Sequence, residues 1–196
     1  MNFELNEKGG WIVPAGTKFA AGTVFPAYSE FGWKCTFAAG CKFSSGYYEF
    51  GWECEFGSDC KFGGGCKFGN YCKFGGGCKF DGYCKFDSCC KFSNNCKFGD
   101  YCEFDSYCKF GAFSKIGKGG TYAGREILQF VNMVNVDGSG RYITIMRHPP
   151  SDDGEITVTA GCFFGSLDKF CEKANSEGKP FYAKAITAVA DAMLSS

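Results

Sequence analysis

Phenylalanine recurs every six residues through the first half of this chain, and a cysteine stands two positions before most of these phenylalanines. From Cys54 to Cys108 the cysteine series steps by six without a gap. Residues two apart in a β-strand point to the same face, so each Cys and its Phe enter one interior, while the residue between them, usually Lys, points to solvent. This period predicts a rigid parallel β-solenoid over about Thr17 to Ile116.

Small hydroxyl residues take the place of cysteine near the ends of this lattice, which shows that the position requires a small side chain. They are Thr17, Thr23 and Ser29 near the start and Ser114 near the end. A reduced cysteine behaves as a small apolar residue, so packing explains the whole column. Stacked cysteines would point in parallel, which is poor disulfide geometry. The lattice has no His and no C-x-x-C pair, so we expect neither a metal nor a cofactor there.

The repeat of six, with an apolar residue at its centre and a small one two before it, resembles the hexapeptide-repeat family of left-handed parallel β-helices. The resemblance covers about half the chain. It implies triangular coils of eighteen residues, left-handed winding, and five to six coils for the seventeen repeats from Phe19 to Ile116. Phe replaces the usual Leu, Ile or Val. The Cys-x-Phe core is also similar to pentapeptide-repeat proteins, but their period is five.

The triplets between successive Cys-x-Phe units are rich in Gly, Asn, Asp and Ser, which suit tight corners. The GGG triplets lack the following helix and GK[ST] ending of a phosphate-binding loop. One extra residue between Phe43 and Phe50 predicts a bulge at that corner, or the seat of a small protrusion. Solenoid ends expose an apolar bore and strand edges. We therefore expect Trp11, Ile12 and Val13 to plug the first coil, and the segment after Gly120 to cover or extend the last.

Composition changes after the repeats, and we divide the chain into an N-terminal cap (1–16), the β-helix (17–120) and a small α+β module (121–196). In the module, REILQFVNMVNV, the DGSG turn and RYITIM predict a β-hairpin, and EITVTA a third strand. Two helices follow, with Ser166 as N-cap of the first and Pro180 in the first turn of the second. The stretch AGCFFGSLDKF and these helices resemble the terminal module of uncharacterised phage and gut-bacterial proteins.

Catalysis is not expected. In hexapeptide-repeat acyltransferases a His acts as general base, and the coil of this chain has no His. The one His, His148, lies in an apparent loop of the module. A pair of Cys162 and His148, oriented by Asp152 or Asp153, is conceivable because all lie in one module. The alternative is a buried Cys and a surface His.

Twenty-one basic and twenty-one acidic residues cancel, so any charge argument must be local. With eighteen residues per coil, lysines should stack in two rows, one of them beside Tyr71 and Tyr107, with Tyr83 and Tyr101 on the third face. Such rows suit a polyanion or single-stranded nucleic acid; alternatively they are a solvated face that blocks edge aggregation. The rows are Lys61, Lys79, Lys97 and Lys115 on one face, and Lys73, Lys91 and Lys109 on another.

Two functional hypotheses follow. The first is a non-enzymatic interaction protein, in which the solenoid presents a module that binds a protein partner or forms a homo-oligomer. The phage resemblance implies an accessory or counter-defence role. The second is a polyanion-binding protein using the Lys and Tyr rows. The sequence has no signal-peptide pattern and no apolar run of membrane-spanning length, so we expect a cytoplasmic location in a bacterial or phage-infected cell and no membrane partner.

Overall fold

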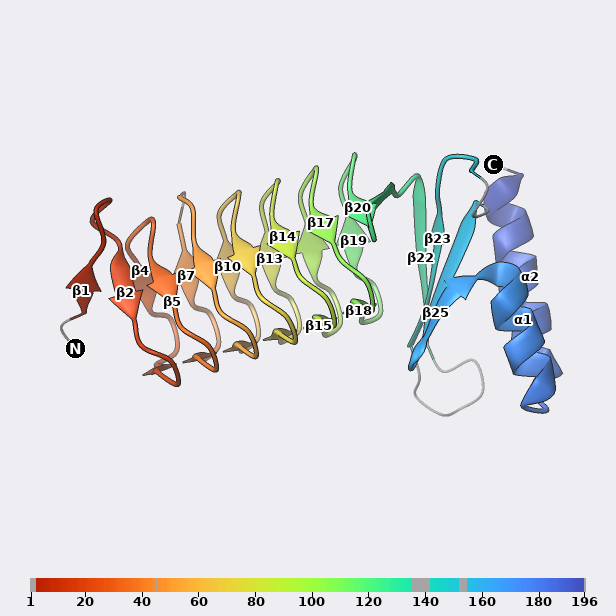
Figure 1. Cartoon of the computed structure of the whole chain (residues 1–196), viewed down its shortest axis with the longest axis horizontal. Coiled ribbons are helices and arrows are strands. Elements are labelled where there is room, and N and C mark those ends of the chain that lie inside the picture. The colour runs from red at the N-terminus through yellow and green to blue at the C-terminus, as the bar shows by residue number, and fades with distance from the viewer. Residues whose placement is uncertain (1–2, 45, 135–141, 152–154, 196) are drawn as a thin grey trace.

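The structure, a computed structural model, describes residues 3–44, 46–134, 142–151 and 155–195. It is mainly β: a rod of about six parallel coils leads into a small antiparallel sheet, and two helices cover the far side of that sheet (Figure 1). The fold class predicted from the repeat is confirmed. The left-handed winding implied by the family resemblance stays a prediction.

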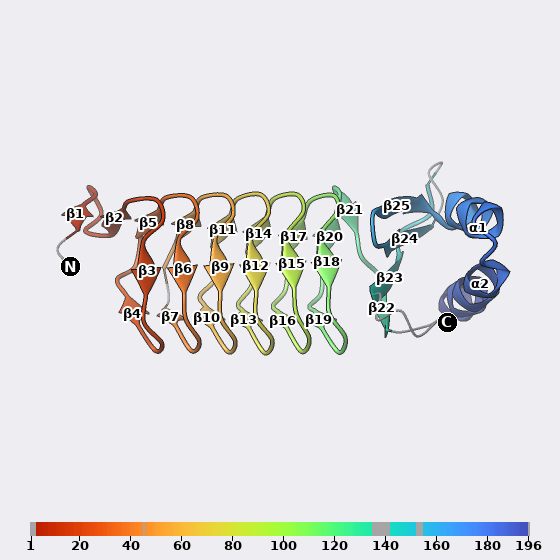
Figure 2. The same cartoon turned by 90° about the horizontal axis from the view of Figure 1, so that it is seen from below.

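Three parallel sheets form the sides of the coil, and we name them A, B and C in the order in which the chain visits them (Figure 2). Sheet A contains β1 (Glu4–Leu5), β2 (Trp11–Val13), β5 (Glu30–Phe31), β8 (Glu49–Phe50), β11 (Lys67–Phe68), β14 (Lys85–Phe86), β17 (Glu103–Phe104), β20 (Thr121–Tyr122) and β21 (Arg125–Glu126). Sheet B contains β3 (Lys18–Phe19), β6 (Thr36–Phe37), β9 (Glu55–Phe56), β12 (Lys73–Phe74), β15 (Lys91–Phe92) and β18 (Lys109–Phe110). Sheet C contains β4 (Val24–Phe25), β7 (Lys42–Phe43), β10 (Lys61–Phe62), β13 (Lys79–Phe80), β16 (Lys97–Phe98) and β19 (Lys115–Ile116).

Strand register confirms that three six-residue repeats make one coil. Phe62 pairs with Phe80, eighteen residues on, while Phe43 pairs with Phe62, nineteen residues on. The extra residue is therefore absorbed at the corner between β7 and β8, as predicted. There Tyr48 takes the place of the cysteine, is fully buried, and donates its hydroxyl to the carbonyl of Phe25 at 3.2 Å.

Phenylalanine rings fill the interior. Within one sheet successive rings stack in parallel at 4.5–5.3 Å, and rings from neighbouring sheets meet edge to face, as Phe62 and Phe68 do at 5.1 Å. The twelve lattice cysteines are fully buried beside them, and all fifteen cysteines of the chain are free. Burying one Phe stabilises by about 1.5–3 kcal/mol, so the column explains a stiff rod.

Each corner turns through a residue in the left-handed region. Glycine meets this need at Gly65 (φ 77°), whereas Tyr83 and Asn95 adopt a φ of 63°. The position before the turn is tight for a different reason: a Cβ on Gly99 would lie 2.6 Å from the backbone nitrogen of Gly82 in the preceding coil. The glycine-rich triplets are therefore corners, as predicted.

The N-terminal end is closed by Phe3 and Trp11, whose rings lie 5.3 Å apart and reach Phe19 and Phe25. Val13 is buried, as expected of a plug. The expectation for Ile12 was wrong: it is exposed because β2 already pairs in parallel with β5, which makes Ile12 the outward residue opposite Glu30. Parallel pairing thus begins at β2 and continues to β20, slightly beyond the expected 17–120 at both ends.

The C-terminal module is a four-stranded antiparallel sheet with two helices. The predicted hairpin and third strand are β22 (Gln129–Val134), β23 (Tyr142–Arg147) and β24 (Ile156–Ala160); the DGSG turn lies outside the described residues. A fourth strand that was not predicted, β25 (Phe163–Ser166), leads into α1 (Leu167–Ser176), and α2 (Pro180–Leu194) follows. Ser166 caps α1 by accepting from the Lys169 amide, and Pro180 opens α2, as predicted.

One face of this sheet closes the coil, and the other carries the helices (Figure 1). Phe130 meets Phe110 of the last coil edge to face at 5.1 Å, and the Asn132 amide donates to the carbonyl of Gly111 at 3.0 Å. Ile143 and Ile145, which alternate with the coil-facing residues, pack beneath α1 and α2. The module therefore covers the last coil, as expected.

Candidate functional site

Sheet C carries an unbroken line of lysines along the outside of the rod. Each pairs in register with the next, and all are exposed. Neighbouring strands lie about 4.8 Å apart, so the line runs for roughly 19 Å. We call it row C: Lys42, Lys61, Lys79, Lys97 and Lys115.

Row C is not neutralised by carboxylates. Among the described residues, none of its five ammonium groups forms an ion pair, whereas on sheet A Lys67 pairs with Glu49 at 3.5 Å and Lys85 with Glu103 at 2.9 Å. Two like charges about 5 Å apart in water repel by on the order of 1 kcal/mol. Row C therefore holds its charges together against their mutual repulsion.

The second predicted row, Lys73, Lys91 and Lys109, stacks on sheet B as expected from the eighteen-residue coil. We call it row B. Its first member is paired, because Lys73 donates to Glu55 at 2.7 Å.

The charges of the three faces are unequal. Outward positions of sheet C hold five lysines and no acid, and those of sheet B hold four lysines and one glutamate. Those of the parallel strands of sheet A, β2 to β20, hold two lysines and three glutamates. The outward strand positions of sheets B and C are therefore basic, while Asp59, Asp81 and Asp100 occupy the corners that flank sheet C.

The tyrosines sit on corners, and the structure does not bring all of them together. Tyr71 and Tyr107 lie at the corner from sheet A to sheet B, two coils apart, and Tyr107 packs against Phe164 of the module at 5.6 Å. Tyr83 and Tyr101 lie at the corner from sheet C to sheet A and stack on each other at 5.2 Å. The paired, exposed rings are thus the ones that border row C.

The conceivable Cys-His pair is not assembled. His148 follows the end of β23 that pairs with Ile156, and Cys162 follows Ala160 at the other end of β24, about 15 Å away by strand length. The alternative of a buried Cys and a surface His was wrong on both counts, since Cys162 is exposed and His148 is fully buried. Burial lowers the pKa of His148, whose Nδ1 lies 2.7 Å from the carbonyl of Glu126.

Asp152 and Asp153, proposed to orient that His, lie outside the described residues. In the parts of the chain that the structure describes, no group of three or more His, Cys, Asp or Glu side chains is placed to hold a metal ion.

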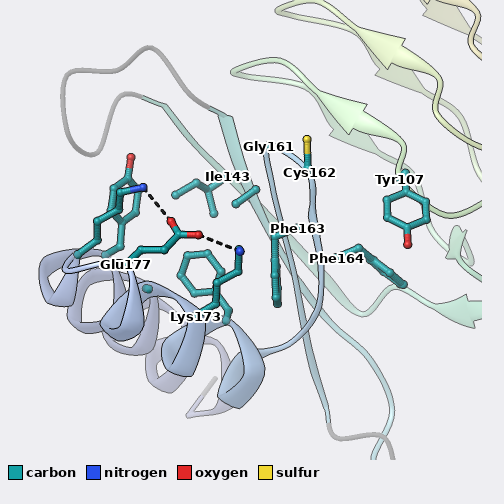
Figure 3. Close-up of a pocket in the computed structure, with 13 residues that line it drawn as sticks. Tyr107, Ile143, Gly161, Cys162, Phe163, Phe164, Lys173 and Glu177 are labelled. Carbon is teal, nitrogen blue, oxygen red and sulfur yellow. Dashed lines mark hydrogen bonds and ion pairs between the residues drawn. The ribbon is translucent and has the colours of Figure 1, made fainter.

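A cavity of about 660 Å³ lies where the module meets the last coil (Figure 3). It is half open to solvent and is lined by the β24–β25 hairpin, by α1 and its connection to α2, and by Tyr107 of the coil. The sequence did not predict it, because its lining residues come from separate strands and helices of the module, with Tyr107 of the coil beside them. Its walls include Phe163, Phe170 and Tyr182.

Comparisons with known proteins give no match: no family model, no curated protein and no solved structure is similar to this chain. The hexapeptide-repeat and phage resemblances therefore stay predictions. Over the described residues, neither α1 nor α2 is long and apolar enough to cross a bilayer.

Proposed function

We propose that this chain is a non-enzymatic binding protein that holds a polyanion along row C. The observation that carries the proposal is the unneutralised charge of row C, on a chain with equal numbers of acidic and basic residues. Lysines that served solubility alone would be as effective if interspersed with acids, as they are on sheet A.

The rigidity of the coil supports this proposal. Row C stands on two-residue strands fixed by backbone hydrogen bonds, such as Lys79 N to Cys60 O at 2.9 Å. A preformed line of charge loses less backbone entropy on binding than a flexible basic tail would. Row B on the adjacent face adds further lysines, and the stacked, partly exposed rings of Tyr83 and Tyr101 lie along one border of row C.

The test is titration of a fluorescent oligonucleotide, single-stranded or duplex, over a range of salt. If all five lysines contact phosphates, the logarithm of the binding constant falls against that of salt with a slope of about −3.5 for a single strand and −4.5 for a duplex. Polyphosphate and heparin as competitors separate nucleic acid from other polyanions.

Matched variants locate the site. The pair Lys61→Gln and Lys79→Gln lies on the same two coils as the pair Lys67→Gln and Lys85→Gln. The row C pair should weaken binding about tenfold or more and flatten the salt slope, while the sheet A pair should change binding by roughly twofold or less. Equal effects of the two pairs, or no salt-dependent binding by the unaltered protein, would contradict the proposal.

A protein-binding role for the module is the second candidate, and one surface favours it. Strand β22 is an edge of the module sheet, and a shallow, open apolar groove of about 520 Å³ lies between it and α2. Capture of partners from a nuclease-treated bacterial lysate, with the unaltered chain compared with Ala188→Glu, would identify this role. Partners retained by both proteins would argue against the groove. Its lining includes Phe130, Val131, Ala188, Val189, Ala192 and Met193.

A further inference from the structure

The cavity between the module and the coil has the size and lining of a small-molecule site. Its volume of about 660 Å³ lies within the 300–1,000 Å³ typical of ligand pockets. Phe170 and Tyr182 are almost fully buried in its wall, Ile143 forms its floor, and the Phe163 ring meets Phe170 at 5.3 Å (Figure 3). Such walls favour a flat apolar group.

The rim of the cavity is positively charged. Glu177 lies between Lys173 at 2.8 Å and Lys179 at 2.9 Å, and hydrogen bonds from these two lysines lower the pKa of Glu177 to about 2. Two ammonium groups thus face one carboxylate (Figure 3). Each ammonium carries three N–H donors, of which the contact to Glu177 uses one, so both can also donate to an incoming anion.

The module supplies almost the whole of this site. Tyr107 reaches the cavity from the last coil and packs on Phe164, while every other lining residue belongs to the module. Lys173, Lys179 and the aromatic walls therefore lie on the helix side of the module sheet, away from the coil.

We propose that this cavity binds a small aromatic molecule with a single anionic group. The ring lies among Phe163, Phe170 and Tyr182, and the carboxylate or sulfonate accepts hydrogen bonds from Lys173 and Lys179. Binding is non-covalent and separate from row C, so it stands whether or not the coil binds a polyanion.

The test uses two dyes of nearly the same shape on the full-length protein. 1-Anilinonaphthalene-8-sulfonate carries the anionic group, and N-phenyl-1-naphthylamine lacks it. We expect saturable binding of one anionic dye per chain, with a fluorescence increase, and binding at least tenfold weaker for the neutral dye.

Three variants assign the dye to the cavity. Lys173→Gln with Lys179→Gln should weaken the sulfonate dye about tenfold and leave the neutral dye unchanged. Lys169→Gln with Lys184→Gln, exposed lysines on the same two helices but outside the cavity, should change neither. Ala174→Leu, which fills the cavity from α1, should weaken both.

If Ala174→Leu fails to fold, as judged by circular dichroism, N-ethylmaleimide on the exposed Cys162 at the mouth serves instead, with the site confirmed by mass spectrometry. The proposal is overturned if the sulfonate dye does not bind saturably. It is also overturned if neither the rim variant Lys173→Gln with Lys179→Gln nor filling of the cavity changes the affinity of the sulfonate dye.

Discussion

Each lattice cysteine is both a small apolar filler and a weak donor. The thiol of Cys78 lies 3.3 Å from the carbonyl of Gly57 in the preceding coil, and Cys72 makes the same contact with Gly51 at 3.5 Å. At the N-terminal end Ser29 does more: its hydroxyl donates to Pro26 O at 2.7 Å and accepts from the Trp11 amide at 3.0 Å. A hydroxyl suits the first coil because the backbone N–H of Trp11 in β2 needs a hydrogen-bond acceptor there. In the inner coils this position mainly requires a small side chain that fills the interior.

The thiol column makes stability sensitive to alkaline pH. Burial raises the pKa of Cys41 to about 11, above its value in an unfolded chain. Folding therefore favours the protonated thiol. This contribution is complete below about pH 8.5 and is lost as the pH rises through 11, by up to roughly 1.4 kcal/mol per pH unit for each such thiol.

Urea denaturation at pH 7 to 11 should show a falling free energy of unfolding. The variant Cys41→Ser, which lacks one titrating group, should show a smaller decrease over the same pH range. A free energy of unfolding that stays constant from pH 8.5 to 11 would refute this account of the column.

At the scale of the strand, each two-residue element has one outward residue. The electrostatic surroundings of that residue are set mainly by the outward residues of the coils before and after it in the same sheet. On sheet A a lysine has a glutamate beside it, as Lys85 has Glu103. On sheet C, Lys79 stands between Lys61 and Lys97.

Charge reversal should therefore act differently on the two faces. Lys79→Glu replaces two repulsions by two attractions and should raise the free energy of unfolding by about 0.5–1 kcal/mol. Lys85→Glu, the control, exchanges an attraction to Glu103 for one to Lys67 and should leave stability nearly unchanged. Thermal melts at low and high salt measure both, and the gain should shrink as salt rises. A loss of stability for Lys79→Glu would show that row C is not under repulsive strain.

Sequence periodicity predicted the repeating part closely, because the strand register there follows directly from the number of residues in each coil. The stacking of Lys61 with Lys79, and the bulge before Tyr48, follow from counting residues. Counting in eighteens missed Lys42 as a member of row C, because the extra residue moves it nineteen positions from Lys61. Contacts between distant segments cannot be counted in this way: Phe3 in the cap, the burial of His148 and the cavity depend on tertiary contacts that no local pattern encodes.

At the scale of the whole molecule, the module is a cap as well as a carrier of sites. Its sheet covers Phe110 and Tyr122, through Phe130 and Phe164. Helices α1 and α2 lie beyond that sheet, so the surfaces they present point away from the rod (Figure 2).

Removal of the module should make the coil associate. A chain ending after Leu128 would expose the rings of Phe110 and Tyr122 together with the open strand edges of the last coil, and such edges pair with one another. Sedimentation velocity should show concentration-dependent oligomers, while the full-length chain serves as reference. A truncated chain that sediments as a monomer at every concentration would show that the coil end needs no cover.

The register of eighteen residues per coil also makes length a quantity that changes in fixed steps. Duplicating or deleting one coil would shift the two ends by about 4.8 Å and leave both caps intact, because neither contacts the middle of the rod. Each step would also add or remove one lysine of row C, so reach and charge would rise together. The length of the rod and the number of ammonium groups in row C are therefore coupled, with one charge for each coil.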